Sequence, residues 1–329
     1  MYLRFYGLRE PPFELTPNPK YLYFTPRHRE ALSNLQYGLS TAKPVTLLIG
    51  EAGTGKTTLI RAALDSEMCR HVKCVYLNNP TLTRTEFVEM LAARFGLGAD
   101  AAQSKAVLLN ELEKVLRARR EKGELTALVV DEAQSLNGEL LEEIRLLANV
   151  ETATDKLLPL VLAGQPELAD RLNDSSLRQL KQRVALRCEI SPFDLPETAA
   201  YIAARIRLAG GEASRLFTRE AVMRIHEYSH GIPRLISVIC DNALLTGLAL
   251  GRQPVDREIV LDVCRDFDLR QDGRGIVRHA NATFSRPEGE EAGSDAPELV
   301  PASEGTGDQP ETFERSDASP RVGLFGSGR

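Results

Sequence analysis

The amino-acid sequence predicts an α/β fold in which a five-stranded parallel sheet is sandwiched by helices, followed by a small all-helical domain and a disordered tail. An apolar run at residues 45–49 enters a glycine-rich loop and then a helix. Apolar runs and amphipathic segments then alternate up to residue 190, and this alternation requires parallel strands covered on both faces. From Phe193 to residue 269 the remaining pattern is helical.

The glycine-rich loop has the spacing G-x-x-x-x-G-K-[ST] of a phosphate-binding loop. Its glycines can adopt backbone angles that turn consecutive amides inward around a phosphate at a helix N-terminus. Lys56 would bridge β- and γ-phosphate oxygens, and the Thr57 hydroxyl would help to coordinate Mg²⁺. The residues expected to bind a nucleoside triphosphate are Gly50, Glu51, Ala52, Gly53, Thr54, Gly55, Lys56, Thr57 and Thr58.

A second motif is the apolar run at residues 127–130, which ends in Asp131 and Glu132. Successive residues at a strand end point in different directions, so Asp131 can reach the Mg²⁺ shell while Glu132 faces an attacking water. Such a pair is common and usually solvated, and the upstream phosphate loop is what gives it a catalytic meaning. The glutamate predicts hydrolysis as well as binding, because a water nucleophile must be oriented.

The other elements follow in order along the chain. Further strands are expected at residues 73–79, 157–163 and 185–190, and helices at residues 57–64, 83–95, 104–120, 138–148, 194–208, 218–229, 233–250 and 256–267. Thr83 with Glu86 and Asp194 with Glu197 have the spacing of capping boxes. The resulting parts are a linker and helix (1–44), a nucleotide-binding core (45–191), a helical lid (192–269) and an acidic tail (270–329).

Composition agrees with a mainly globular protein: 329 residues, 43% hydrophobic and 26% charged, with a net charge of −5. The tail contains seven Arg and eleven acidic residues, so it carries −4 of that charge and leaves the folded part near neutral. No overall basic field attracts nucleic acid, although a local basic patch could. Rich in Glu, Pro, Gly and Ser, the tail is expected to be disordered, with residues 322–325 as a candidate docking peptide.

The five cysteines are odd in number and lack metal-ligand spacing, which predicts buried free thiols. No apolar run approaches the about 20 residues that span a bilayer, and the N-terminus lacks the apolar core of a signal peptide. The sequence therefore predicts a cytoplasmic protein with no membrane span of its own.

The phosphate loop, the Asp-Glu strand and the trailing helices resemble an AAA+ ATPase, specifically the group of secretion-pathway protein A and the related transposition-helper ATPases. The likeness covers about residues 1–270. The matching segments are Pro12-Phe13, Tyr21 to Phe24, His28 to Leu32, Leu35 to Gly38, Asp131 to Gln134, Leu162 to Leu168, Gln182 to Val184 and Gly231 to Arg234. In this family the N-terminal segment and helix close over the adenine.

The resemblance implies catalytic roles for three further residues. Arg183 lies where the family places an arginine finger, which would reach the γ-phosphate in a neighbouring subunit and implies a homo-oligomer, either a ring or a filament. Arg234 would be the γ-phosphate sensor of the lid. Gln165 stands where many relatives carry a shorter water-contacting Asn or Thr, and Pro166 can turn its side chain away. From the residues alone, a surface ion-pair partner is the commoner role for each arginine, and only the resemblance raises the catalytic one.

Two clusters keep alternatives open. Seven of the nineteen Phe and Tyr residues lie within residues 1–24, where they could form an adenine wall or simply a hydrophobic core. The basic run of Arg117, Arg119, Arg120 and Lys122 is typical of a solvated helix end, and the alternative is a DNA contact.

The sequence thus predicts an oligomeric ATPase that uses ATP and Mg²⁺. It would act as a motor or regulator of a secretion, pilus or exopolysaccharide apparatus, with protein partners in that envelope apparatus. The alternatives are a DNA-associated ATPase that supports transposition and an ATP-loaded switch with little turnover.

Overall fold

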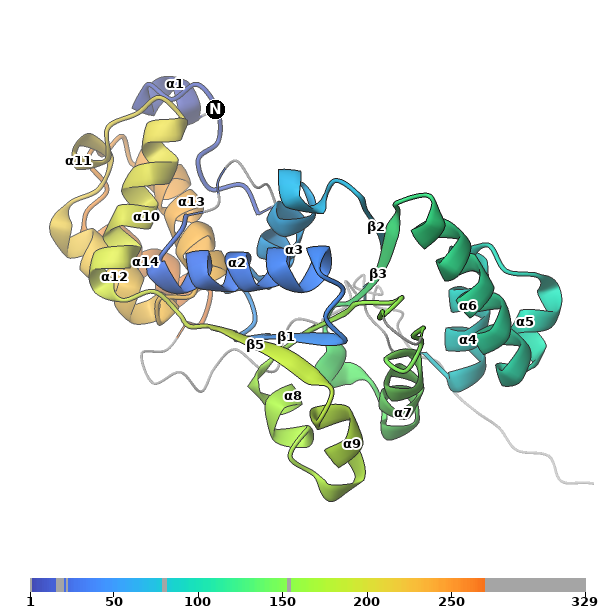
Figure 1. The fold of residues 1–329 in the computed structure, drawn as a ribbon. Helices are drawn as coiled ribbons and strands as arrows, with labels where there is room; N and C mark the ends of the chain where they lie inside the picture. Colours follow the sequence, from blue (N-terminus) through green and yellow to red (C-terminus); the bar gives the residue numbers. More distant parts are fainter. Residues whose placement is uncertain (1, 16–20, 22, 79–81, 153–154, 270–329) are drawn as a thin grey trace, which may run out of the picture. The chain divides into compact units, whose positions relative to one another are not determined.

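The computed structural model describes residues 2–15, 21, 23–78, 82–152 and 155–269 (Figure 1). The tail predicted at residues 270–329 lies outside the described residues, as does the end of the strand predicted at residues 73–79. In the described part, a sheet with helices on both faces precedes a bundle of helices.

The sheet consists of five parallel strands in the order β2-β3-β4-β1-β5, which confirms the predicted fold class. The strands are β1 (Val45–Gly50), β2 (Val72–Leu77), β3 (Leu125–Val130), β4 (Leu160–Gly164) and β5 (Val184–Ile190). All residues of the three inner strands are buried, as expected of parallel strands covered on both faces. β4 begins at Leu160 rather than Leu157, because Pro159 has no amide hydrogen and only accepts a hydrogen bond from Leu128.

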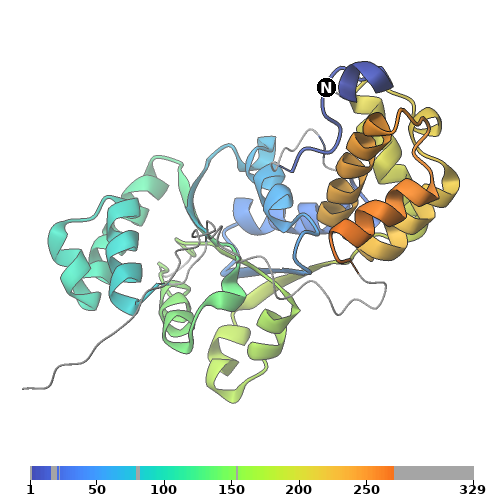
Figure 2. The ribbon, with the colours of Figure 1, turned by 180° about the vertical axis from the view of Figure 1, so that it is seen from behind.

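Helices cover both faces of the sheet (Figures 1 and 2). The α-helices of the described part, including those of the bundle, are α1 (Tyr2–Tyr6), α2 (Pro26–Ser40), α3 (Lys56–Leu64), α4 (Arg84–Phe95), α5 (Ala99–Gln103), α6 (Lys105–Glu121), α7 (Gly138–Leu147), α8 (Pro166–Arg171), α9 (Arg178–Lys181), α10 (Leu195–Leu208), α11 (Ala213–Leu216), α12 (Arg219–Ser229), α13 (Pro233–Ala249) and α14 (Arg257–Asp266). Single turns of 3₁₀ helix lie at η2 (Glu67–Cys69), η3 (Ala133–Ser135) and η4 (Ser175–Leu177). Among the described residues, no helix is both long and apolar enough to cross a membrane.

Each strand contributes to two hydrophobic cores, because successive side chains point to opposite faces. Leu48 and Val129 pack with α2 and α3 on one face. Leu47 and Leu128 pack with α4, α6, α7 and α8 on the other. Both predicted capping boxes are present, and they set the starts of α4 and α10.

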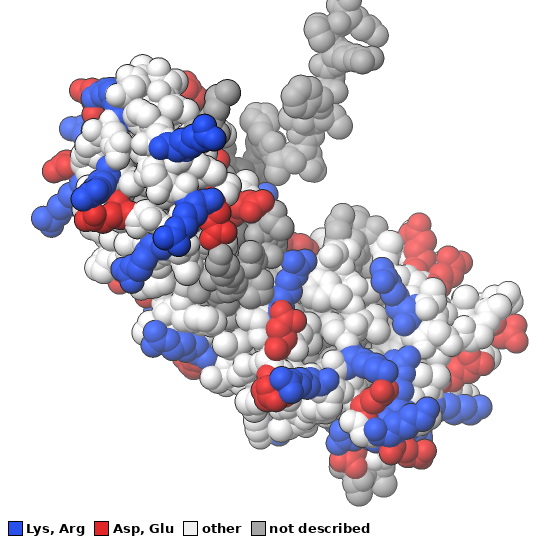
Figure 3. Space-filling model, turned by 90° about the horizontal axis from the view of Figure 1, so that it is seen from above, with Lys and Arg blue, Asp and Glu red and all other residues white. Residues whose placement is uncertain are grey.

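The basic run at the end of α6 is partly engaged within the protein. Arg117 pairs with Glu113 at 2.6 Å, and Arg119 donates to the hydroxyl of Thr126 and the carbonyl of Phe95. On the face shown in Figure 3, Lys and Arg side chains are interspersed with Asp and Glu side chains. These contacts are those of a solvated helix end with its own ion pairs.

Four of the five free cysteines are buried, as predicted. The prediction is wrong for Cys74, which is exposed. Cys74 lies on β2, an edge strand of the sheet, so one of its sides is open to solvent.

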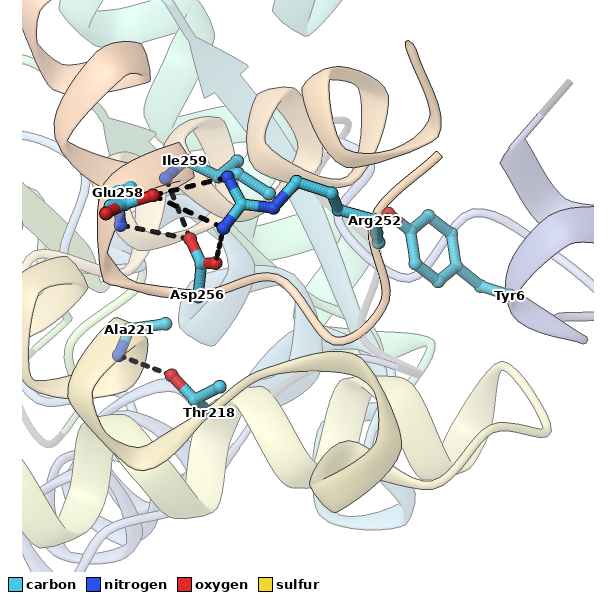
Figure 4. Close-up of polar contacts among 7 residues, drawn as sticks. All are labelled: Tyr6, Thr218, Ala221, Arg252, Asp256, Glu258 and Ile259. Atoms are coloured by element: carbon cyan, nitrogen blue, oxygen red, sulfur yellow. Dashed lines mark hydrogen bonds and ion pairs between the residues drawn. The ribbon is translucent and has the colours of Figure 1, made fainter. Parts of the chain in front are cut away.

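The helical bundle, α10 to α14, has its own core, and residues from the start of the chain belong to it. Tyr2 donates to Asp241 of α13 at 2.6 Å, and the Tyr6 hydroxyl lies 3.5 Å from the carbonyl oxygen of Arg252 (Figure 4). The Arg252 guanidinium pairs in turn with Asp256 and Glu258 at the start of α14. The first residues, expected as part of a linker, therefore pack as part of the bundle.

Candidate active site

The phosphate loop joins β1 to α3, and its backbone bends at two glycines. Gly53 and Gly55 have φ angles of +82° and +102°, a region that favours glycine. Gly55 is the N-cap of α3, so the loop passes directly into the first helical turn. A Cβ atom at Gly53 would lie 2.8 Å from the Cβ of Arg234, which leaves no room for a side chain. The motif therefore has the strand, loop and helix context that phosphate binding requires.

Lys56, the first residue of α3, folds back along the loop. Its Nζ donates hydrogen bonds to the carbonyl oxygens of Gly50 at 2.7 Å and Glu51 at 3.1 Å. Burial lowers the pKa of the ammonium, whereas the carboxylates of Glu132 and Asp131 raise it. A cation is thus placed beside the backbone amides where a polyphosphate would need it.

Thr57 and Asp131 meet at the carboxyl end of the sheet. The Thr57 hydroxyl donates to Oδ2 of Asp131 at 2.6 Å. The phenol of Tyr76 donates to the same oxygen at 2.8 Å, because β2 lies beside β3 with Leu77 opposite Val130. Burial and the Asp131 carboxylate raise the pKa of Tyr76, so its phenol stays protonated and remains a donor at neutral pH.

The oxygen atoms of Thr57 and Asp131 fit a Mg²⁺ ion. Mg²⁺ prefers oxygen ligands and usually combines one or two carboxylates with waters and substrate phosphates. The described residues contain no group of three or more His, Cys, Asp or Glu side chains that could hold a metal by themselves. A metal at this site would therefore depend on bound phosphates for its remaining ligands.

Glu132 follows β3 in a left-handed turn, with a φ of +55°. Its backbone amide donates to Oδ1 of Asp131 at 3.0 Å, and its carboxylate accepts a hydrogen bond from Nε2 of Gln134 at 2.6 Å. Glu132 lines the same pocket as Lys56 and Thr57. The two adjacent acids therefore face different partners within one site.

Gln165 is connected to this site through Gln134. Its backbone amide donates to Oε1 of Gln134 at 3.1 Å, and it forms the N-cap of α8. Arg171 of α8 holds the same residue, Gln134, by donating to its backbone carbonyl oxygen at 2.6 Å. As far as the described residues define the pocket, Gln165 does not line it. The Gln165 backbone is thus connected through Gln134 to Glu132, and a direct sensor role of its side chain stays a prediction.

A pocket of about 350 Å³ extends from the phosphate loop to the bundle. One end is lined by residues 53–58 and Glu132, and the other by the aromatic and polar side chains of Tyr21, Tyr23, His28, Phe193, Tyr201, Arg205 and Ser237. The ring centroids of Tyr23 and Phe193 are 5.8 Å apart, and those of Phe193 and Tyr201 are 5.3 Å apart. The pocket thus combines a cationic loop with an aromatic end.

The N-terminal aromatic residues have two kinds of surroundings. Tyr2, Tyr6 and Phe13 belong to the core of the bundle, as the core alternative predicts. Tyr21 and Tyr23 line the pocket, and Tyr23 also packs against that core. An adenine wall at Tyr21 and Tyr23 stays a prediction.

His28 and Arg234 attach the loop to its surroundings. His28 Nδ1 lies 2.8 Å from the hydroxyl of Thr25, and Nε2 lies 3.4 Å from the carbonyl oxygen of Thr54. Because a carbonyl only accepts, this geometry assigns the proton to Nε2, and burial lowers the pKa of the ring. On the other side, the amide of Arg234 donates to the carbonyl of Gly53 at 3.2 Å. The loop is therefore held by α2 and by the bundle.

Arg183 lies at the opposite end of the sheet from the phosphate loop. It precedes β5, whose first residue, Val184, pairs with Val45, whereas the far end of β5 pairs with Gly50. At about 3.3 Å per strand residue, this separates Arg183 from its own loop by roughly 20 Å. The structure brings Lys56, Thr57, Asp131, Glu132 and Arg234 together and leaves Arg183 outside this site.

Two residues of the site were not singled out from the sequence. Tyr76 carries a usable signal, because it lies near the carboxyl end of the strand that precedes the carboxylate strand. Arg205 carries none, since its partners are distant in sequence and a helical arginine usually faces solvent.

The sequence matches the AAA domain family over residues 40–172. It is also 41% identical over 255 residues to General secretion pathway protein A of Aeromonas hydrophila, a match that covers 78% of this chain and 46% of that protein. The chain thus spans less than half the length of this relative.

Two solved structures share the fold. Cdc6p from Pyrobaculum aerophilum aligns with a TM-score of 0.57 and 20% identity, covering 74% of this chain and 68% of that one. The ORC1 protein of Aeropyrum pernix, solved in complex with DNA, aligns with a TM-score of 0.58 and 19% identity, covering 77% and 68%. At these identities the likeness concerns the fold alone.

The phosphate loop, the parallel sheet with its Asp-Glu strand and the family match define the class: residues 40–172 are an AAA domain with a phosphate-binding loop. Within that class the chain is similar, over most of its length, to General secretion pathway protein A.

Proposed function

We propose that this protein binds ATP with Mg²⁺ and hydrolyses it. The observation that carries the proposal is the 2.6 Å hydrogen bond between Thr57 and Asp131, made beside a pocket that Lys56 and Glu132 both line. A phosphate loop alone would support binding. The adjacent acid that faces the pocket adds a group able to orient water.

In the proposed reaction, the loop amides and the Lys56 ammonium hold the β- and γ-phosphates. Thr57 and Asp131 would hold Mg²⁺, which would supply positive charge to neutralise the transferring group. The Glu132 carboxylate accepts a hydrogen bond from the attacking water and directs it at the γ-phosphorus, while Gln134 keeps that carboxylate in place. Arg234 lines the pocket from the bundle, so loss of the γ-phosphate would remove a contact of the bundle with the nucleotide.

We also propose that hydrolysis is completed by a second copy of the chain. Arg183 is about 20 Å from its own phosphate loop, so it can stabilise the transferring phosphoryl group only in a neighbouring subunit. The proposal therefore includes a ring or filament of identical chains.

Three variants test these roles. Lys56→Ala is expected to abolish nucleotide binding, whereas Glu132→Gln should keep ATP affinity and lower turnover by about 100-fold or more. Arg183→Ala should bind ATP normally and turn over slowly, and mixing it with the inactive Lys56→Ala chain should restore activity. Arg187→Ala, which removes an exposed arginine of β5, the strand that follows Arg183, is the matched control. Equal loss of binding in the first two variants, or no recovery on mixing, would defeat the assignments.

The process served by the ATPase is proposed from similarity. The match to General secretion pathway protein A supports a motor or regulator of a secretion, pilus or exopolysaccharide apparatus, acting through protein partners. Isolation of the complex from its native cell in the presence of ATP, with the Glu132→Gln chain as bait, would test this. Envelope proteins that bind with ATP and leave with ADP are the expected result.

The DNA-associated alternative has a direct test. The described surface intersperses acidic with basic side chains on the face in Figure 3, and the basic run of α6 is engaged in its own contacts. ATP-dependent retardation of duplex DNA would favour this alternative, and the absence of retardation would favour the secretion role.

A further inference from the structure

Arg205 of α10 occupies an unusual position for an arginine. Its guanidinium carbon lies 5.1 Å from the ring centroid of Tyr21 and 5.0 Å from that of Tyr201. One ring belongs to the N-terminal part of the chain and the other to the bundle. A guanidinium within about 6 Å of two aromatic faces is attracted to both.

The same guanidinium also binds the N-terminal backbone. Nη1 donates to the carbonyl oxygens of Pro12 at 3.0 Å and Glu14 at 3.3 Å. One side chain of the bundle thus contacts both the backbone at Pro12 and Glu14 and the ring of Tyr21.

A second observation concerns the remaining donor. Nε of Arg205 is buried and has no hydrogen-bond partner among the described residues. Buried donors are nearly always paired, and an unpaired one is expected where a bound group completes the set.

Arg205, Tyr21 and Tyr201 all line the pocket that begins at the phosphate loop. The loop fixes the triphosphate at one end, so the rest of the nucleotide must extend toward the aromatic end. His28 lies between the two ends of the pocket. Its ring is 3.4 Å from the carbonyl oxygen of Thr54 in the phosphate loop, and 5.6 Å from the ring of Phe193 at the aromatic end.

We propose that Arg205 is a positioning residue for the base of the bound nucleotide: it holds Tyr21 as a wall of the base site and so sets the affinity for the planar base, without contributing to phosphate binding. This inference rests on the proposed ATP-binding function. The inference gives Arg205, which belongs to no recognisable sequence motif, a role in the affinity for the base.

The experiment compares two ligands that share only the phosphates. Binding of MgATP and of magnesium tripolyphosphate is measured by calorimetry for the wild type, Arg205→Ala and Arg207→Ala. Arg207 is exposed on the same helix and serves as the matched control. We expect Arg205→Ala to weaken MgATP by about tenfold and to leave tripolyphosphate unchanged, since only ring and base contacts are lost. Arg207→Ala should change neither.

A second variant keeps the inference testable if Arg205→Ala does not fold. Tyr21→Leu retains an apolar side chain but removes the aromatic wall, and it should show the same selective loss for MgATP. Equal weakening of both ligands, or unchanged MgATP affinity in both variants, would overturn the role of Arg205. If the wild type binds neither ligand, the proposed ATP-binding function itself fails.

Discussion

Replacing Tyr76 with Phe tests how the candidate metal site is oriented. The Asp131 carboxylate accepts three hydrogen bonds, from Thr57 and Tyr76 on Oδ2 and from the Glu132 amide on Oδ1. Phe keeps the ring and its packing but removes one donor. If Asp131 must face Mg²⁺, loss of that donor should weaken the metal-dependent part of nucleotide binding.

The magnitude follows from the type of bond that is removed. A hydrogen bond to a charged acceptor contributes about 1.5–3 kcal/mol. The lower end applies here, because Tyr76 is only partly buried and two other donors continue to hold the carboxylate. About 1.5 kcal/mol corresponds to roughly a tenfold change in an equilibrium constant.

The assay measures ATP affinity with excess Mg²⁺ and again with a chelator, so that the ratio reports the coupling between metal and protein. We expect the ratio to fall about tenfold in Tyr76→Phe, with affinity in the chelator unchanged. Tyr37→Phe, at a tyrosine that is 45% exposed, is the control and should have no effect. An unchanged ratio in Tyr76→Phe would refute the argument that this phenol orients Asp131.

Two further predictions concern stability. Gly231 has a φ of +73°, and a Cβ there would overlap the Phe193 carbonyl, so Gly231→Ala should lower the free energy of unfolding by about 2 kcal/mol or more. The control Gly123→Ala, at a φ of +77° with open space around it, should lower the free energy of unfolding by only about 1 kcal/mol. Equal losses of the two variants in urea denaturation would contradict the argument from overlap. Burial lowers the pKa of His28 from its ordinary 6.5, so the unfolded chain binds more protons than the folded chain. The contribution of the neutral ring to the free energy of unfolding is therefore complete above pH 6.5 and is lost as the pH falls through the lowered folded value. His28→Gln should therefore make stability decline less between pH 7.5 and 5.5, and an unchanged decline would remove His28 from the explanation.

Much of the fold could be predicted because its signals are local. Each inner strand is a short apolar run, and the loop from Gly50 to Thr57 carries its glycines at fixed spacing. The capping boxes at Thr83 and Asp194 need only residues three positions apart. The start of β4 was misjudged, since an apolar pattern does not register that Pro159 cannot donate to the ladder.

The site could be predicted where its residues are close together in the sequence. Lys56 and Thr57 follow the loop, and Glu132 follows Asp131, so their proximity needs only the strand and the helix. Tyr76 was missed because its role depends on which strand lies beside β3.

The amino-acid pattern was enough to locate a phosphate-loop motif and an adjacent pair of acids at the end of a buried strand, because backbone angles and side-chain spacing act over a few residues. It took the three-dimensional fold to show that Thr57 meets Asp131, that Arg183 lies away from its own loop, and that Arg205 joins the N-terminal segment to the bundle. These relations join residues far apart in the chain. They depend on strand order and on the packing of the bundle, which no local pattern encodes.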